Sequence, residues 1–93
     1  MEESSIIWTE YMMYRLKLRG YDLATVENIL RYSSERYADT VTRREVAIGQ
    51  HEKLLVMIPY EHESTMRTML TPVTIHATSR QQINSRIKSG RLK

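Results

Sequence analysis

Residues 44–60 read REVAIGQHEKLLVMIPY and carry the pattern of a β-hairpin. In the first part polar and apolar residues alternate, so Val46 and Ile48 point to one face of a strand and their neighbours to the other. The segment 49–53 is polar and contains glycine, which predicts the turn. Residues 54–60 are apolar on both faces, as is typical of a central strand.

Two helices are predicted before the hairpin. Residues 6–19 contain neither Gly nor Pro, and an apolar stripe recurs there at helical spacing. The stripe consists of Ile7, Tyr11, Tyr14 and Leu18. Gly20 is a suitable stop, and Asp22 a suitable N-cap for a second helix. The apolar face of the second helix consists of Leu23, Val26, Ile29 and Leu30. We therefore expect an αα-hairpin, and Tyr11, Tyr14 and Tyr21 fit its buried face.

The C-terminal third is predicted to be a strand followed by a helix. In the strand 70–77, Val73, Ile75 and Ala77 face one side, and Thr74 and His76 face the other. The sequence Thr78-Ser79-Arg80-Gln81 then matches a capping box and opens a helix that ends before Gly90. A short polar strand is expected at 35–41, and a polar loop at 61–68.

The predicted class is α+β, with an N-terminal helical hairpin, a four-stranded antiparallel β-meander and a C-terminal helix, in the order α-α-β-β-β-β-α. We expect the helices to cover one face of the sheet, where Val46, Ile48, Val73 and Ile75 would be buried. The opposite face, with Thr74 and His76, would be partly open.

Length and composition indicate one domain over residues 1–93, with 1–5 and 89–93 frayed. There is no cysteine, no apolar run long enough to span a bilayer and no signal-peptide pattern, so we expect a cytoplasmic protein. The net charge of +3 is uneven: residues 1–42 carry −2 and residues 43–93 carry +5. A basic half suggests a polyanionic partner, although a solvated charged face explains the charge equally well.

The residues that could carry chemistry are few. Nucleotide-binding and zinc-protease motifs are absent. His51, at a hairpin tip, and His62, in a loop, are predicted to be solvated rather than metal ligands. His76 precedes a helix N-terminus, where Arg80 could share a bound phosphate with it. The alternative is that His76 bonds a neighbouring strand and Arg80 is simply exposed.

Further candidates are basic or aromatic. Arg43 and Arg44 form a second cationic cluster near the expected position of Tyr37. Tyrosines offer a stacking face for a base, and Tyr32, Tyr37 and Tyr60 are candidates for that role. Met66 and Met69 border the predicted loop and could form a partner-binding patch.

Residues 53–61, KLLVMIPYE, and 73–80, VTIHATSR, resemble the C-terminal half of BrnT-type toxins, which belong to the RelE-like superfamily of type II toxin–antitoxin systems. Residues 15–21, RLKLRGY, and 26–30, VENIL, are similar to the helical hairpin of a domain family near BrnT. The resemblance implies a ribonuclease without metal or cofactor, in which a 2′-OH attacks the adjacent phosphate, and a cognate antitoxin that covers a basic groove.

Carried onto this chain, the resemblance makes His76 a general acid or base and Arg80 a phosphate clamp. Glu35 and Tyr37 are weaker catalytic candidates, chosen by expected proximity. The expected RNA or phosphate contacts are Arg43, Arg44, Tyr60 and Arg86. Two alternatives stay open: a non-catalytic module that binds nucleic acid or protein, and a partner protein that dimerises through a Met- and Tyr-rich surface.

Overall fold

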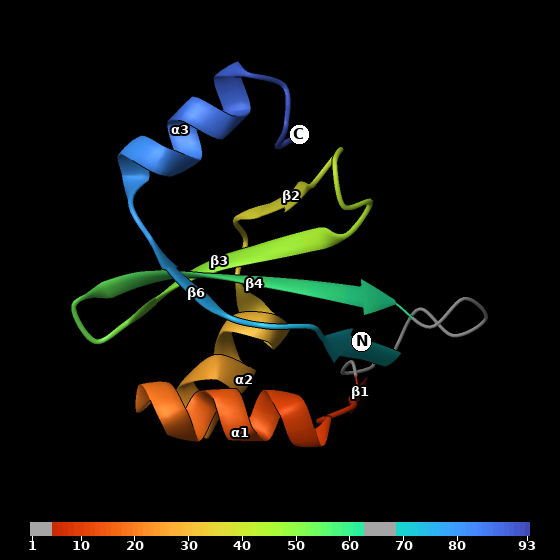
Figure 1. Ribbon diagram of the computed structural model, residues 1–93, viewed down its shortest axis with the longest axis vertical. Helices are drawn as coiled ribbons and strands as arrows, with labels where there is room; N and C mark the ends of the chain where they lie inside the picture. Colours follow the sequence, from red (N-terminus) through yellow and green to blue (C-terminus); the bar gives the residue numbers. More distant parts are fainter. Residues whose placement is uncertain (1–4, 63–68) are drawn as a thin grey trace.

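The chain folds as an α+β domain in which two helices precede a mostly antiparallel sheet and a third helix follows it (Figure 1). The computed structural model describes residues 5–62 and 69–93. The elements are β1 (Ser5–Ile6), α1 (Glu10–Arg19), α2 (Leu23–Tyr32), β2 (Arg36–Ala38), β3 (Glu45–His51), β4 (Leu54–His62), β5 (Met69–Pro72), β6 (His76–Thr78) and α3 (Arg80–Lys88). The predicted fold class is confirmed.

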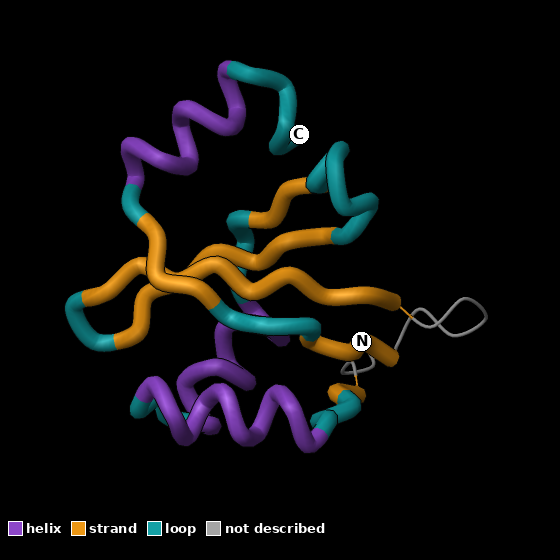
Figure 2. The backbone as a smooth tube through the Cα atoms, in the orientation of Figure 1, coloured by secondary structure: helices purple, strands orange, loops and turns teal. Residues whose placement is uncertain are grey.

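The sheet is built around the predicted hairpin of β3 and β4, in which Ile48 lies opposite Met57. The strand order is β1-β5-β4-β3-β2, and β6 pairs with β4 beyond the end of β5. The sheet is mixed because β1 runs parallel to β5. The single last strand expected at 70–77 is interrupted at residues 73–75, so that β5 and β6 line successive parts of β4 (Figure 2).

Helices cover both faces of the sheet, which corrects the expectation of one open face (Figure 1). Val46 and Ile48 pack under α3 with Met57, Ile83 and Leu92. Ile75 instead belongs to the core under α1 and α2, together with the small side chain of Ala47. The expected grouping of Val46 and Ile48 with Ile75 is wrong because strand alternation does not carry across the break at 73–75.

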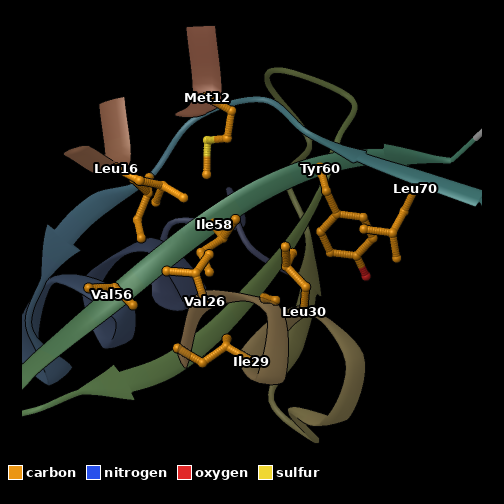
Figure 3. Close-up of a cluster of buried hydrophobic side chains, with 11 residues drawn as sticks. Met12, Leu16, Val26, Ile29, Leu30, Val56, Ile58, Tyr60 and Leu70 are labelled. Carbon is orange, nitrogen blue, oxygen red and sulfur yellow. The ribbon is translucent and has the colours of Figure 1, made fainter. Parts of the chain in front are cut away.

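Helix α1 turns its longer apolar stripe away from the sheet. The buried α1 residues are Met12 and Leu16, which meet Val26 and Leu30 of α2 in the core shown in Figure 3. The expectation that Tyr11 and Tyr14 would be buried is therefore wrong, whereas Tyr21 is partly buried as expected. The two stripes of α1 have the same helical period, so the period alone did not distinguish them.

Local signals explain the element boundaries. Gly20 ends α1 in the left-handed region at φ 72°, and the Asp22 carboxylate accepts a hydrogen bond from the Thr25 N–H at 3.0 Å, as predicted. The N-cap of α3 is Ser79, one residue later than the predicted capping box, and its hydroxyl accepts from the Gln82 N–H at 3.2 Å.

The C-terminal residues close one edge of the sheet. Leu92 is buried and bridges to Asp39, and the Lys93 N–H donates to the Ala38 carbonyl at 3.0 Å. The expectation that residues 89–93 fray is therefore wrong. Arg91 also forms an ion pair with the buried carboxylate of Asp39 at 3.3 Å. These contacts cover the C-terminal end of β2 at this edge of the sheet.

In the part of the chain that the structure describes, no helix has the length and apolar character that crossing a membrane requires. Three predictions lie wholly or partly outside the described residues, namely the fraying of residues 1–5, Met66 and the larger part of the loop at 61–68. Residues 61 and 62 are the end of β4, and Met69 begins β5.

Candidate functional site

The clearest cluster of basic groups surrounds β6, where the sheet ends. The short strand β6 pairs with β4. In this pair His76 lies opposite Met57, and Thr78 lies opposite Leu55. Residues directly opposite one another in antiparallel strands share a face, so His76 lies on the face that carries α3. His76 and Ala77 are both exposed. The imidazole is thus presented at an accessible edge.

Two arginines from different helices contact the neighbours of His76. The Nε of Arg15 on α1 donates to the carbonyl of Ile75 at 3.4 Å. The Nη1 of Arg86 on α3 lies 3.8 Å from the sulfur of Met57, which is the cross-strand partner of His76. The Arg15 guanidinium therefore lies beside the residue that precedes His76, and the Arg86 guanidinium lies beside the residue opposite His76 on β4. We call Arg15, Arg19, His76 and Arg86 the cationic edge.

The surroundings of His76 favour its neutral form. Partial withdrawal from water is the largest cause that lowers its pKa from 6.5, followed by the positive charges of Arg15, Arg86 and Arg19. An imidazole that is neutral near pH 7 can accept a proton, while the nearby guanidinium groups can hold an anion. The cationic edge therefore places an imidazole that is neutral near pH 7 beside guanidinium groups.

A second cluster joins Glu35, Tyr37 and Arg80. Both terminal nitrogens of Arg80 donate to the Glu35 carboxylate, and the Tyr37 hydroxyl donates to Glu35 Oε2 at 2.8 Å. The hydrogen bond from Arg80 is the main cause that lowers the pKa of Glu35, and the hydrogen bond to Glu35 raises the pKa of Tyr37. Three of the four predicted catalytic residues are thus brought together, but as a closed ion-pair network.

His76, the fourth, lies apart from this cluster. Glu35, Ile48, Met57 and His76 occupy one row across the sheet, because the Ile48 N–H donates to the Glu35 carbonyl and Ile48 lies opposite Met57. Three strand spacings separate the ends of this row by about 14 Å. Ile83 of α3 packs on Ile48 and Met57 in the middle. The structure therefore pairs His76 with Arg86 rather than with Arg80.

The other predicted RNA contacts lie elsewhere. Tyr60 is 3% exposed, and its hydroxyl accepts from Arg36 Nη1 at 2.9 Å, so it belongs to the core and offers no face for a base (Figure 3). Arg44 pairs with Glu61 at 3.2 Å, and Arg43 is exposed with φ 65°. Both arginines lie at the start of β3, next to Glu45. Glu45 is paired with Tyr60 of β4, whereas His76 is paired with Met57, so the arginines lie farther along the sheet than His76.

The remaining histidines have structural partners. The prediction that His51 is solvated is wrong: it is buried, its Nε2 accepts from the Asp22 N–H at 2.8 Å, and its ring packs edge-on against Tyr21. His62 is exposed as expected, at the end of β4, where it lies 2.6 Å from Glu45. Within residues 5–62 and 69–93, no group of three His, Cys, Asp or Glu side chains is arranged to hold a metal ion.

Sequence reasoning missed Arg15 and Arg19. They are four residues apart and lie beside the buried positions of α1. Met12 and Leu16 are also four residues apart, and this second apolar pair is the signal from which the orientation of the two arginines toward the sheet could have been predicted.

No protein-family model matches this chain, and no similar protein was found among curated proteins or among solved structures. The resemblance to BrnT-type toxins therefore stays a prediction, and the function must be argued from the cationic edge itself.

Proposed function

We propose that this protein binds RNA at the cationic edge and cleaves it by attack of a 2′-OH on the adjacent phosphodiester. The observation that carries this proposal is the position of His76 between two guanidinium groups, supplied by α1 and α3 at an exposed strand. Arg86 belongs to the RNA contacts that the sequence suggests. The activity is that of a toxin-like endoribonuclease, and the partner that would restrain it is a cognate antitoxin.

The proposed reaction needs only water and the groups present at this edge. Arg15 and Arg86 hold the phosphate and stabilise the negative charge that grows on its oxygens in the transition state. The neutral imidazole of His76 accepts the proton of the 2′-OH. The 2′-oxygen forms a bond to phosphorus, the bond from phosphorus to the 5′-oxygen breaks, and the departing 5′-oxygen takes a proton from water. The products are a 2′,3′-cyclic phosphate and a free 5′-OH.

The distribution of charge supports an RNA ligand over a neutral one. Residues 43–93 carry +5, and Arg86 lies in α3, whose last turn is also basic. Such a field raises the rate of encounter with a polyanion and makes binding sensitive to salt. A single-stranded region fits best, because its phosphates and 2′-hydroxyls can adjust to a small edge.

A second candidate is RNA binding without cleavage. Every charged side chain that shifts the pKa of His76 is an arginine, and the carboxylate of Glu35 is occupied by Arg80 and Tyr37. This arrangement favours holding an anion, and it leaves protonation of the leaving group to solvent. Binding and turnover must therefore be measured separately.

The test uses a labelled single-stranded RNA of mixed sequence and a DNA of the same sequence, both in EDTA. We expect the wild type to cleave the RNA and not the DNA, and His76→Ala to lower the rate by about 100-fold or more. Arg86→Ala should weaken both binding and cleavage. Arg31→Ala is the matched control, because Arg31 lies on α2 and pairs with Glu27.

Three results discriminate the candidates. Cleavage that survives in His76→Ala removes this residue from the mechanism. Salt-dependent binding without cleavage, lost in Arg86→Ala and kept in Arg31→Ala, supports the second candidate instead. If the wild type neither binds nor cleaves RNA, both are wrong.

A further inference from the structure

Helix α1 presents three large apolar side chains to solvent. The exposed fractions are 56% for Tyr11, 62% for Tyr14 and 61% for Leu18, and Ile7, which precedes the N-cap of the helix, is 36% exposed. We call these four residues the outer stripe. Helix α1 has already buried a different side, that of Met12 and Leu16, against the sheet and α2 (Figure 3). The outer stripe therefore takes no part in the core of a single chain.

The spacing of the outer stripe is that of a helix–helix seam. Its three helical residues follow one another at intervals of three and four, which is the a/d pattern of a heptad repeat, while Ile7 lies before the helix and its N–H donates to the Leu70 carbonyl. A single exposed apolar residue needs no explanation, but three along one side of a helix, two of them tyrosines, mark an interaction surface. Large aromatic side chains are also common at such contacts.

Two opposite charges lie on one flank of the outer stripe. Glu10 and Lys17 are seven residues apart and occupy equivalent heptad positions. Neither forms an ion pair with any other residue that the structure describes. When two copies of α1 pack antiparallel about a two-fold axis, Glu10 of each copy faces Lys17 of the other. The outer stripe thus carries its own complementary charges.

We propose that two copies of this chain associate through the outer stripe, with their α1 helices antiparallel. Around the two-fold axis Tyr11 packs on the second copy's Tyr14, and Leu18 lies at the outer end of the contact, while two equal ion pairs form at the flanks. Such an isologous contact closes on itself and stops at a dimer. The proposal does not depend on RNA binding.

The expected dimer is weak. Helix α1 has ten residues and so is about 15 Å long. A contact of this length falls below the size of a permanent interface. We expect a dissociation constant of about 100 µM, so the dimer forms at high local concentration and separates on dilution.

The first measurement is sedimentation velocity over a concentration series up to about 1 mM. We expect the wild type to shift from monomer to dimer, and Leu18→Ser to weaken the association by about tenfold. Val41→Ser is the matched control, because Val41 is 69% exposed but lies in the segment between β2 and β3 rather than on α1. A wild type that stays monomeric throughout overturns the proposal, as does an equal effect of the two substitutions.

The second measurement tests the antiparallel arrangement. Glu10→Lys and Lys17→Glu should each weaken self-association by about tenfold, because like charges then face one another at both flanks. A mixture of the two variants should form a heterodimer, since opposite charges are restored at both flanks. Circular dichroism of each variant checks that α1 is intact. Failure of the mixture to associate, when each variant is folded and the wild type dimerises, overturns the antiparallel arrangement.

Discussion

Arg80 places both of its terminal nitrogens on the carboxylate of Glu35, and the contact from Nη2 to Oε1 measures 3.1 Å. The two residues are 45 positions apart and belong to α3 and to the segment that precedes β2. The carboxylate holds the guanidinium in the way a bound phosphate would. The guanidinium of Arg80 is thus already occupied by an internal acid.

Glu35→Gln should free Arg80 for RNA. The substitution removes the negative charge that competes with phosphate but keeps an acceptor for the Tyr37 hydroxyl. We expect tighter RNA binding and a salt dependence steeper by about 0.7 in slope, as one added phosphate contact predicts. Binding is measured by fluorescence anisotropy at several salt concentrations. Glu27→Gln, which disturbs a pair on α2, is the control, and an unchanged slope in Glu35→Gln would show that Arg80 takes no part.

The titration of His76 should respond to Arg86. Burial and three arginines lower the pKa of His76 below 6.5, so its imidazole becomes neutral at a lower pH than a free histidine. Arg86→Gln removes one positive charge and should move the pKa of His76 upward. The rising limb of the cleavage profile should move to higher pH with it. An NMR titration measures the pKa of His76 without relying on cleavage, once the His76 signal is assigned by its absence in His76→Ala. If the pKa of His76 is the same in Arg86→Gln as in the wild type, the prediction is wrong.

Gly49→Ala should destabilise the fold by forcing α2 away from β3. A Cβ at position 49 would lie 2.5 Å from Cγ1 of Ile29, well inside contact distance. Overpacking of this kind costs about 1–3 kcal/mol, measured by urea denaturation. In the double variant Ile29→Ala/Gly49→Ala the two costs should be less than additive. Full additivity would mean that the two residues do not press on one another.

Stability should depend on Asp39 in a defined pH range. Burial acts to raise the pKa of Asp39, but the N–H groups of Thr42 and Val41 and the Arg91 guanidinium outweigh it and lower the pKa below 3.8. A lowered carboxyl pKa means that its stabilisation is present above pH 3.8 and lost as the pH falls through the folded value. Asp39→Ala should therefore cost about 2 kcal/mol at neutral pH, and less below pH 3.8.

Urea denaturation of the wild type and of Asp39→Ala between pH 7 and pH 3 measures the difference in their free energies of unfolding. Asp39→Asn keeps one hydrogen-bond acceptor, so its free energy of unfolding should lie between those of the wild type and Asp39→Ala. A constant difference across the range would show that the charge of Asp39 contributes nothing.

The sequence predicted the elements of the sheet well where a local pattern determined them. The hairpin of β3 and β4 was found because alternation, a polar turn and a doubly apolar strand agree over residues 44–60. The break between β5 and β6 was missed, since residues 73–75 continue a strand-like composition. The cationic edge could be predicted only in part: His76 and Arg86 were chosen, whereas Arg15 and Arg19 were not.

The sequence by itself determined the three helices and the hairpin of β3 and β4, because caps, turns and side-chain periodicity act within a few residues. Tertiary structure alone decided which stripe of α1 is buried, which face of the sheet α3 covers, and whether Arg80 meets His76 or Glu35. Those outcomes depend on contacts between residues far apart in the chain, whose free energies no local pattern contains. The outer stripe and the cationic edge, the two surfaces proposed to act, both result from that choice.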